Sequence, residues 1–593
     1  MSLLSSLVAA YDRLPDAPPP GYALQKIDFA LTLKPDGTPG GLIDLREDKG
    51  KKKISRLMMV PEPPKRTVKI DPNFLWDKSA YVLGIGSSKR LAAEHAAFVA
   101  LHREALAGSD DAGLRALLFF LERWRPESFD DSGWPEDLRD ANIVFRLLDG
   151  GAREFLHERP AARRAWADLR AARGGQGSAL CLLSGERKAP ARLHPAIKGV
   201  WGGQSSGASI VSFNLDAFES YGHKQGANAP VGEEEAFKYT TVLNRFLQTD
   251  SGHRVQIGDA SCVFWAEAPT LEQVEQAEAT GGWMLGLSGI DEEKQAGAVK
   301  DILEKIRLGR PLRSFAPKLA EGVRFYVLGL APNAARLSIR FWFQDDFGVL
   351  AQRYRRFLAD MAVEPGDGDS LPTLWKYLLE LAVQHKRENV PPNLAGDWMR
   401  AILTGQRYPQ TLLSSALMRI RADKTVNARR VALLKAVLLR NFDMEKEVPV
   451  THDEDNDNRG YRLGRLFALY EYIQEKALGD KVNATIKDKF YGAASSRPRG
   501  VFPFLQRNSA HHLSKLRRER PKQQKWLHKK LDEVMEPMER TPASFPATLP
   551  TVDQALFALG YHHERKALRD KRGDDQTGKP KDNASADAEE TQP

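Results

Sequence analysis

The chain has 593 residues, 42% hydrophobic and 28% charged, and Lys plus Arg exceed Asp plus Glu by 87 to 78. This length is too great for one hydrophobic core, so we expect about two to four globular domains. Two cysteines, Cys181 and Cys262, exclude a disulfide framework and a Cys-rich zinc site, and they fit a reducing cytoplasm.

The N-terminal segment predicts a short amphipathic helix, because apolar residues from Leu3 to Tyr11 recur at helical spacing. It lacks the basic start of a signal peptide, and the chain has no apolar run of about 18 residues or more, so we expect no membrane association. Residues 27–33 and 42–45 predict a β-hairpin with a turn at 35–38, and residues 89–106 and 112–122 predict helices.

Later strand patterns separate the chain into two regions. Strands are predicted at 209–213, 261–265, 325–330 and 336–343, whereas from about residue 370 only the 3.6-residue helical period remains. Helices are predicted at 371–385, 395–404, 411–422, 428–441, 462–477 and 511–535.

These patterns predict an α+β fold. Residues 1–365 should form a mixed α/β N-terminal region, in one piece or two subdomains, followed by an all-α helical-bundle domain over residues 366–570. Residues 571–593 are polar with almost no large apolar residue, so we expect a disordered tail.

Positive charge is concentrated in three stretches, at residues 49–69, 407–440 and 497–530. They hold eight, eight and eleven Lys/Arg respectively, each against a single acidic residue. One such stretch is often only a solvated face. Three stretches with so few acidic residues favour a polyanionic partner, because phosphate groups would neutralise their positive charges and release bound counterions.

The first stretch leads directly into an Asn and aromatic residues. Asn73 could read a base edge, and Phe74 or Trp76 could wedge between base steps; the alternatives are a simple turn at Asn73 and core packing for both rings. The candidate DNA-binding residues of this region are Lys49, Lys51, Lys52, Lys53, Arg56, Lys65, Arg66, Lys69, Asn73, Phe74, Trp76 and Lys78.

A glycine-rich polar loop spans residues 202–207 and precedes the strand predicted before Asn214. Glycines permit close backbone approach, and neutral amides and hydroxyls suit phosphate or sugar contact, although an ordinary loop has the same composition. Gln204, Ser205, Ser206 and Asn214 are therefore candidates for nucleic-acid backbone contact.

No motif of a catalytic centre is complete. The loop at residues 84–90 lacks the P-loop and Rossmann glycine spacing, and His452-Asp453 lies in an acidic segment that fails as a calcium loop at Asn458. His511-His512 lacks zincin spacing. We predict no catalytic residues, metal or cofactor.

Several long segments resemble the large subunit of the type I-C CRISPR surveillance complex (Cascade), the Csd-type CRISPR-associated family. They run in one order over nearly the whole chain. They are PPKRT at 63–67, NFLWDKSAYVLG at 73–84, CLLSGE at 181–186, SFNLDAFESYG at 212–222, NAPV at 228–231, VFWAE at 263–267, FYVLGLAPNAARLSIRFW at 325–342, YRLGRLFALYEYIQ at 461–474, KFYGAAS at 489–495 and FALGYHHER at 557–565.

The resemblance implies a non-catalytic binding subunit. It would recognise the protospacer-adjacent motif (PAM) in duplex DNA through its N-terminal part, promote unwinding and R-loop formation, and hold the displaced strand along its helical domain. Implied partners are the CRISPR RNA ribonucleoprotein, target double-stranded DNA and its displaced single strand, the Cascade backbone and small subunits, and a recruited helicase–nuclease.

The two C-terminal basic stretches supply the candidate displaced-strand contacts. These are Arg419, Arg421, Lys424, Arg429, Arg430, Arg497, Arg499, Arg507, Lys515, Arg517, Arg518 and Lys522. Family members can also make the C-terminal part separately by internal translation, and here Met444 is the best start. Two other hypotheses are a metal-dependent nuclease acting on DNA or RNA, and a scaffold that binds only protein and guide RNA.

Overall fold

The computed structural model describes residues 2–14, 17–49, 52–64, 66, 69–148, 154–173, 178–286, 293–479, 484–539 and 544–576. The chain divides into two compact units. The first comprises residues 1–197 and 209–245, and the second comprises residues 198–208 and 246–593.

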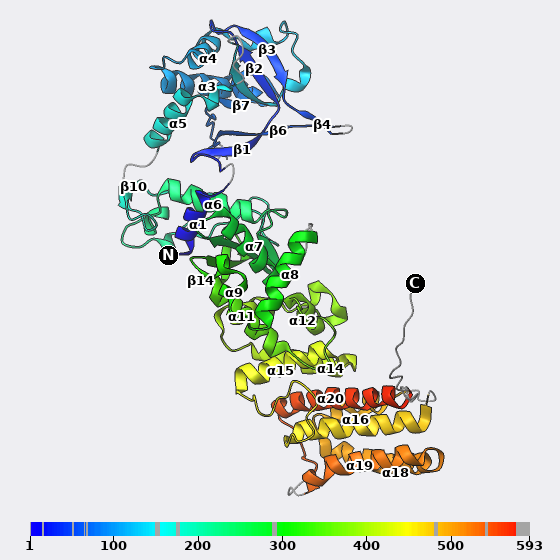
Figure 1. Cartoon of the computed structure of the whole chain (residues 1–593). Helices are drawn as coiled ribbons and strands as arrows, with labels where there is room; N and C mark the ends of the chain where they lie inside the picture. The colour runs from blue at the N-terminus through cyan, green and yellow to red at the C-terminus, as the bar shows by residue number, and fades with distance from the viewer. Residues whose placement is uncertain are drawn as a thin grey trace, which may run out of the picture. The chain divides into compact units, whose positions relative to one another are not determined.

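The first unit is built on a four-stranded sheet of order β3-β2-β8-β7 (Figure 1). Its strands are β2 (Phe29–Leu33), β3 (Pro39–Asp44), β7 (Trp76–Lys78) and β8 (Asn142–Leu147). β2 pairs parallel with β8, and the other two pairs are antiparallel. The predicted hairpin at 27–45 is thus confirmed. Helices α3 (Leu91–Leu106) and α4 (Ala112–Arg123) share the core of the sheet through Phe98, Leu117 and Phe120.

A long β-ribbon extends this sheet. β3 leads into β4 (Glu47–Lys49), which pairs antiparallel with β5 (Lys52–Ile54). The chain then continues into β6 (Arg56–Pro61), which pairs antiparallel with β1 (Tyr22–Ile27). In Figure 1, β4 lies at the end that projects from the unit.

The rest of the first unit consists of helices and irregular segments. The predicted N-terminal helix is α1 (Leu3–Tyr11), whose Tyr11 ring lies edge-on to Phe237 of α6 with centroids 6.2 Å apart. The remaining elements are α2 (Ser79–Val82), η1 (Pro126–Phe129), η2 (Glu136–Leu138), η3 (Leu156–Glu158), α5 (Pro160–Arg173), β9 (Ala179–Leu180), β10 (Arg187–Lys188), η4 (Asp216–Phe218), η5 (Gln225–Asn228) and α6 (Glu233–Phe246).

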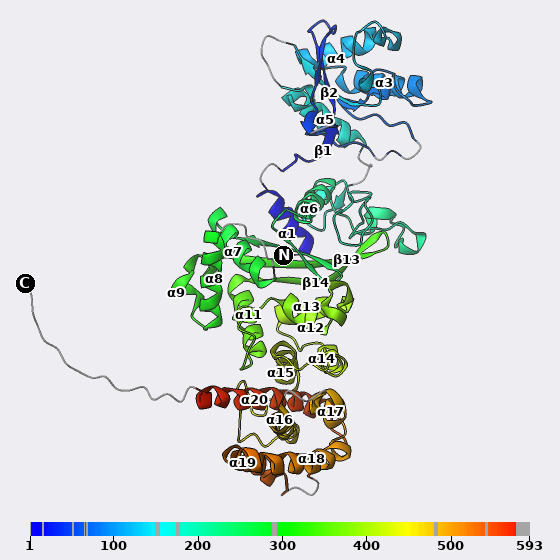
Figure 2. The same cartoon turned by 90° about the vertical axis from the view of Figure 1, so that its right-hand side faces the viewer.

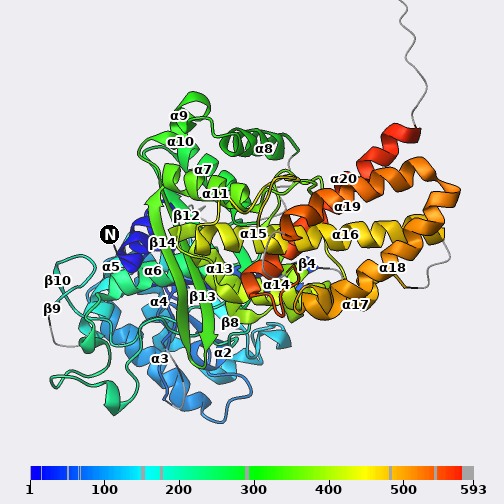
Figure 3. The ribbon, with the colours of Figure 1, turned by 90° about the horizontal axis from the view of Figure 1, so that it is seen from below.

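The second unit begins with an antiparallel sheet of order β11-β12-β13-β14. The strands are β11 (Arg254–Ile257), β12 (Ala260–Glu267), β13 (Arg324–Asn333) and β14 (Arg336–Asp346), and the last two run side by side in Figure 3. Phe264, Phe325 and Phe341 point into one core with helices α7 (Leu271–Met284), α8 (Glu293–Arg307) and α11 (Phe347–Met361). The predicted strands at 261–265, 325–330 and 336–343 are confirmed.

Helices then stack in layers, with α14 and α15 beside α20, α16 next, and α18 with α19 beyond, as both views show (Figures 1 and 2). The elements are α9 (Leu312–Phe315), α10 (Pro317–Ala320), α12 (Leu374–Leu381), η6 (Val383–His385), η7 (Arg387–Asn389), α13 (Pro392–Thr404), α14 (Gln410–Asp423), α15 (Ala428–Phe442), α16 (Arg459–Leu478), α17 (Ile486–Ala494), α18 (Pro498–Glu519), α19 (Pro521–Glu539) and α20 (Thr551–Gln576).

The α+β class and the helical C-terminal region are confirmed: after β14, the described residues contain helices and no strand. The division into units differs from the expected boundary at residues 365 and 366, because one hydrophobic core runs from Val255 in the sheet to Leu568 in α20. Within the expected tail, residues 571–576 continue α20, and residues 577–593 lie outside the described part.

Two predicted elements are wrong. Residues 209–213 form no strand, and their side chains are half-buried in an irregular segment. The helix predicted at 511–535 is two helices, because α18 ends at Glu519 and Pro521 begins α19. Proline favours the first turn of a helix and lacks the N–H needed to continue one, so the break falls there.

Candidate nucleic-acid interface

The first basic stretch and the segment that follows it carry several cations that remain at the surface. Arg56, Lys69 and Lys78 are exposed, and Lys53 is exposed with its Nζ 2.7 Å from Asp44 Oδ2. Lys51 and Lys65 lie outside the described residues, as do the side chains of Lys49 and Lys52. Apart from Arg66, the described candidate cations of this region are therefore exposed, and Lys53 pairs with an acidic neighbour.

Arg66 has a different environment. Its Nη1 donates to Asp77 Oδ1 at 2.9 Å, its Nη2 donates to Asn73 Oδ1 at 2.7 Å, and its guanidinium stacks over the Tyr81 ring at 4.2 Å. Asp77 is fully buried; burial raises its pKa, against Arg66, which lowers it. Arg66 thus neutralises a buried carboxylate, and its ion-pairing capacity is used within the protein.

Asn73, Phe74 and Trp76 are core residues in this conformation, which corrects their interpretation as exposed readers or wedges. Asn73 is 3% exposed, and its backbone N–H donates to Asp77 Oδ2 at 2.8 Å. The Phe74 ring stacks on Trp166 with centroids 5.5 Å apart, and Trp76 Nε1 donates to the Pro61 carbonyl at 2.8 Å. The buried conformation of Phe74 and Trp76 is favoured because it removes large aromatic surfaces from water and still satisfies the Trp76 N–H group.

The polar loop predicted at residues 202–207 is exposed. Gln204, Ser205 and Ser206 are at the surface, and Gly202 and Gly207 have φ of 71° and 88°, conformations that glycine adopts readily. Asn214 is also exposed, but it belongs to the first compact unit and residues 202–207 to the second. Contact of these four residues with a nucleic-acid backbone stays a prediction.

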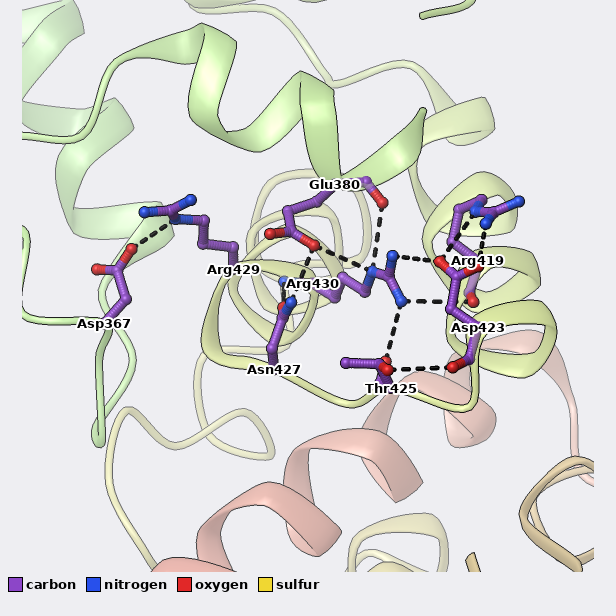
Figure 4. A network of polar contacts seen from close by, with 8 residues as sticks. All are labelled: Asp367, Glu380, Arg419, Asp423, Thr425, Asn427, Arg429 and Arg430. Carbon is purple, nitrogen blue, oxygen red and sulfur yellow. Dashed lines mark hydrogen bonds and ion pairs between the residues drawn. The ribbon is translucent and has the colours of Figure 1, made fainter. Parts of the chain in front are cut away.

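Arg430 of α15 is not available to a ligand, which corrects its assignment to the displaced strand. It is fully buried, with its Nε 3.2 Å from Glu380 Oε2, and its Nη2 bonds to Asp423. Its Nη1 also donates to the carbonyl of Thr425 at 3.1 Å. Figure 4 shows this arginine at the centre of a polar network that joins α12, α14 and α15.

The neighbouring cations of this stretch are also largely engaged. Arg419 pairs with Asp423, and Arg429 Nε lies 2.5 Å from Asp367 Oδ2. Arg421 is exposed and bonds to Gln554. Lys424 is exposed in a left-handed conformation at the end of α14. Of the five residues predicted here, Arg421 and Lys424 are therefore the two at the surface that form no ion pair in the described part of the chain.

The third basic stretch forms an exposed surface on α18 and α19. The apolar side of α18 is buried through Val501, Leu505 and Leu516, so its cations are directed away from the core. We define the α18–α19 turn cluster as Arg517, Arg518, Arg520, Lys522 and Lys525, which are all exposed and make no ion pair within the described residues.

Other predicted cations lie along the same helix. Arg497, Arg499, Arg507 and Lys515 are exposed; Arg499 donates to the Phe545 carbonyl at 3.3 Å, and Lys515 lies 3.9 Å from Glu519. Arg507 and Arg518 are separated by about 16 Å along the helix axis. Acidic residues return only in the second half of α19, where Glu533 accepts from Lys530 at 2.8 Å.

The His452 segment is a structural contact. His452 Nε2 lies 2.7 Å from Glu564 Oε2, and Arg465 Nε donates to the same oxygen at 2.8 Å. Burial acts to raise the pKa of Glu564, but His452 and Arg465 outweigh it, and the pKa is lowered. Among the described residues, no group of three or more His, Cys, Asp or Glu side chains is placed to hold a metal ion.

A family comparison decides the affiliation of the chain. The family described as CRISPR-associated protein (Cas_Csd1) matches residues 7–569, nearly the whole length. The chain belongs to the Cas_Csd1 family of CRISPR-associated proteins. A comparison with curated individual proteins gives no match.

Within the described residues of this Cas_Csd1 chain, no helix combines the length and the apolar composition that a membrane span requires.

The sequence interpretation of this Cas_Csd1 protein missed a second set of cations. Arg307 and Arg355 line a cleft of about 570 Å³ in the second unit, together with the already predicted Arg429 and the acidic residues Glu364, Asp367 and Asp369. Arg355 and Arg356 are exposed on α11. The two arginines of α11 were missed because this helix carries its charge in a short run between apolar residues, without the long acid-poor stretch that marks α18 and α19.

Proposed function

We propose that this Cas_Csd1 protein is the non-catalytic large subunit of a type I-C Cascade complex. In this role it recognises the protospacer-adjacent motif in duplex DNA, promotes R-loop formation and holds the displaced strand for a recruited helicase–nuclease. The family membership supports the CRISPR context, and the sequence resemblance supports the type and the division of roles.

The observation that carries the proposal is the α18–α19 turn cluster. Five cations lie within nine residues, exposed and without an ion pair in the described structure, on helices whose apolar faces are already buried. Keeping such like charges together costs electrostatic energy, which the single acidic residue among them, Glu519, offsets only in part. The phosphates of a nucleic-acid backbone would neutralise these cations, and an exposed cationic surface of this kind can bind a single strand without reading its sequence.

The experiment uses the complex assembled on its guide RNA with a labelled duplex target, with and without Mg²⁺. Binding without cutting supports the proposal, and cutting by the complex supports the nuclease alternative. The absence of both binding and cutting would indicate a scaffold. Permanganate reactivity of the displaced strand then tests the turn cluster.

Arg517→Glu with Arg518→Glu should change the permanganate pattern of the displaced strand while initial motif binding persists. Arg313→Glu is the matched control, since Arg313 is exposed in the same unit and pairs with Glu321. Replacing both arginines by Gln should lower the salt slope of single-strand binding by about 1.4, or roughly 0.7 for each lost phosphate contact. An unchanged slope and permanganate pattern would remove the cluster from the strand path.

Internal translation of a C-terminal fragment stays part of the proposal. Met444 lies between the end of α15 at Phe442 and the start of α16 at Arg459, so a fragment starting there would contain α16 to α20 without splitting a helix. Mass spectrometry of the complex made from its native gene would detect it. A fragment that begins far from Met444, or none, would contradict this part.

A further inference from the structure

Helix α18 presents an aromatic ring to solvent among its cations. Phe504 is 42% exposed, whereas its neighbours Phe502 and Leu505 are buried in the core of the second unit. The Phe504 ring lies against that of Phe490 in α17, with centroids 5.5 Å apart, and Phe490 is itself half-buried against the core. A single exposed ring is ordinary on a protein surface. Phe504 differs from such a ring in its alignment with the polar residues that follow it.

Four nitrogen-bearing side chains lie on the same stripe of α18 as Phe504. At about 100° per residue, they fall within about 60° of Phe504 around the helix axis, roughly opposite the buried side of the helix. They are Arg507, His511, Lys515 and Arg518. All four are exposed, and they follow one another at intervals of about 4.5–6 Å along the axis. The stripe therefore begins with an aromatic face and continues as a row of donors for phosphate groups.

Helix α17 joins this stripe to the exposed cations of α14. α17 packs against α18, and a Cβ added at its Gly492 would lie 4.0 Å from Arg421 Cγ. In Figures 2 and 3, α14, α17 and α18 follow one another along one side of the bundle. α17 also carries Lys489, which is exposed beside Phe490. The pair of Phe490 and Phe504 thus lies where the two C-terminal basic stretches meet.

We propose that Phe504, supported by Phe490, is a stacking platform for one base of the displaced single strand. This rests on the proposed function and adds a contact with a base, which cations alone do not provide. An aromatic face accepts any base, so the contact is independent of sequence. The base must nevertheless be unpaired and unstacked, because in a duplex its two faces are covered by neighbouring bases. The platform would therefore favour single strands over duplex DNA.

The chemistry of the stripe favours a nucleic acid over a protein as the occupant. A single strand supplies a base for the Phe504 ring and phosphates for Arg507 and the donors beyond it, all from one ligand. The acidic residue of α18 is Glu519, at the far end of the helix, so the stripe offers a protein partner few groups to pair with its own cations.

The test uses the assembled complex and two single-stranded oligonucleotides of equal length, oligothymidylate that does not pair with the guide RNA and an abasic strand with the same phosphates. Phe504→Ala should weaken binding of oligothymidylate by about fivefold or more, the contribution of one stacked base. Binding of the abasic strand should stay within about twofold, and the salt slope should not change, because no phosphate contact is lost.

Matched variants separate stacking from other roles. Phe504→Trp should retain the binding of oligothymidylate, whereas Phe504→Leu, which keeps an apolar side chain without an aromatic face, should resemble Phe504→Ala. Phe442→Ala is the control, because Phe442 is 39% exposed in α15 of the same unit, beside the acidic Asp443. Arg507→Gln should weaken both strands alike and lower the salt slope by about 0.7. Thermal unfolding checks that each variant remains folded.

The outcomes distinguish the platform from the strand path. Equal weakening of both strands by Phe504→Ala, normal binding by Phe504→Leu, or the same loss in Phe442→Ala overturns the stacking platform and leaves the proposed function intact. A Phe504→Ala chain that folds but no longer enters the complex would identify a protein contact and also overturns the platform. If the unmodified complex bound neither strand, the proposed holding of the displaced strand would itself be refuted.

Discussion

Arg430 of α15 and Glu380 of α12 form an ion pair with an N–O distance of 3.2 Å and side chains only 1% and 9% exposed. The guanidinium meets Asp423 on its other side and three backbone carbonyls. A buried charge is tolerated when it is paired and its hydrogen bonds are satisfied. This arginine therefore connects three helices, although its position in the sequence suggested a ligand contact.

Arg430→Ala should lower the free energy of unfolding by about 3–5 kcal/mol, since Glu380 would keep a buried, uncompensated charge. Urea unfolding followed by circular dichroism measures this change. Arg517→Ala, at an exposed cation of the same unit, should stay within about 0.5 kcal/mol of the unmodified protein. A small effect at Arg430 together with lost single-strand binding would show that the residue contacts nucleic acid after all.

The contrast between these two arginines shows what sequence alone could predict. Both stand in acid-poor basic stretches, but α15 is apolar on nearly every side and is buried between other helices, so its cations must find partners inside. α18 has one apolar stripe, and its cations stay outside. Composition identified the charge, but the partners Glu380, Asp367 and Asp423 depend on contacts between distant segments, which periodicity does not reveal.

Asn73→Ala should destabilise the first unit by about 1–3 kcal/mol, because the Arg66 Nη2 that now donates to Asn73 would lose a buried partner. Since the side chain is enclosed, we expect motif preference to be unchanged. Chemical denaturation and competition binding with scrambled motifs measure the two quantities. Normal stability with a loss of discrimination of about 1–3 kcal/mol would restore Asn73 as a base reader.

Arg66→Met should make the stability of the first unit depend more strongly on pH. Without Arg66, burial would raise the pKa of Asp77 further, so the folded state would hold a proton that the unfolded state releases. The free energy of unfolding then falls as pH rises above the ordinary carboxyl pKa, by roughly 1.4 kcal/mol for each unit by which the pKa is raised. The deficit relative to the unmodified protein should therefore be larger at pH 7 than at pH 5.

The matched control for this pH effect is the double variant Arg66→Met with Asp77→Asn, which has no carboxylate to titrate. Its deficit should be nearly constant between pH 5 and pH 7. A pH dependence that persists in the double variant would assign it to another group.

Lys435→Met should remove a pH-dependent component of the stability of the second unit. Burial lowers the pKa of Lys435 to about 8, with Asp360 opposing it, and Nζ donates to the Asp360 carbonyl at 3.1 Å. Between this pKa and the ordinary lysine value, the unfolded state binds the proton and the folded state does not, so the free energy of unfolding rises with pH. The rise from pH 8 to pH 10 should be about 2 kcal/mol smaller in the variant. Equal slopes would show that Lys435 titrates normally.

The hydrophobic pattern of the sequence predicted several strands correctly, but it did not predict one helix break or the burial of Phe74. The hairpin at 27–45 and the strands β12 to β14 were visible as alternating or continuous apolar runs with turns between them. The break at Pro521 was missed because α18 and α19 continue the same helical period across it. The burial of Phe74 was undecidable locally, since it depends on Trp166, which lies 92 residues away in the chain.

Helices α16 and α20 cross at close range, which the sequence pattern did not predict. A Cβ on Gly464 would lie 2.0 Å from the Phe557 carbonyl oxygen, and one on Gly560 would lie 2.1 Å from that of Tyr461. These atoms are backbone of a facing helix and cannot move aside alone. Gly464→Ala should therefore push the helices apart and cost about 3 kcal/mol or more.

Gly500→Ala is the matched control for Gly464→Ala, because Gly500 lies in α18 with nothing within 4 Å of an added Cβ. This substitution should stabilise the protein by about 0.5–1 kcal/mol through helix propensity and reduced chain entropy. Thermal and urea unfolding of both variants measure the difference. If Gly464→Ala were as stable as Gly500→Ala, α16 and α20 would have to lie further apart, and the contacts of Glu471 with Tyr561 and of Arg465 with Glu564 that depend on this spacing would need to be reassigned.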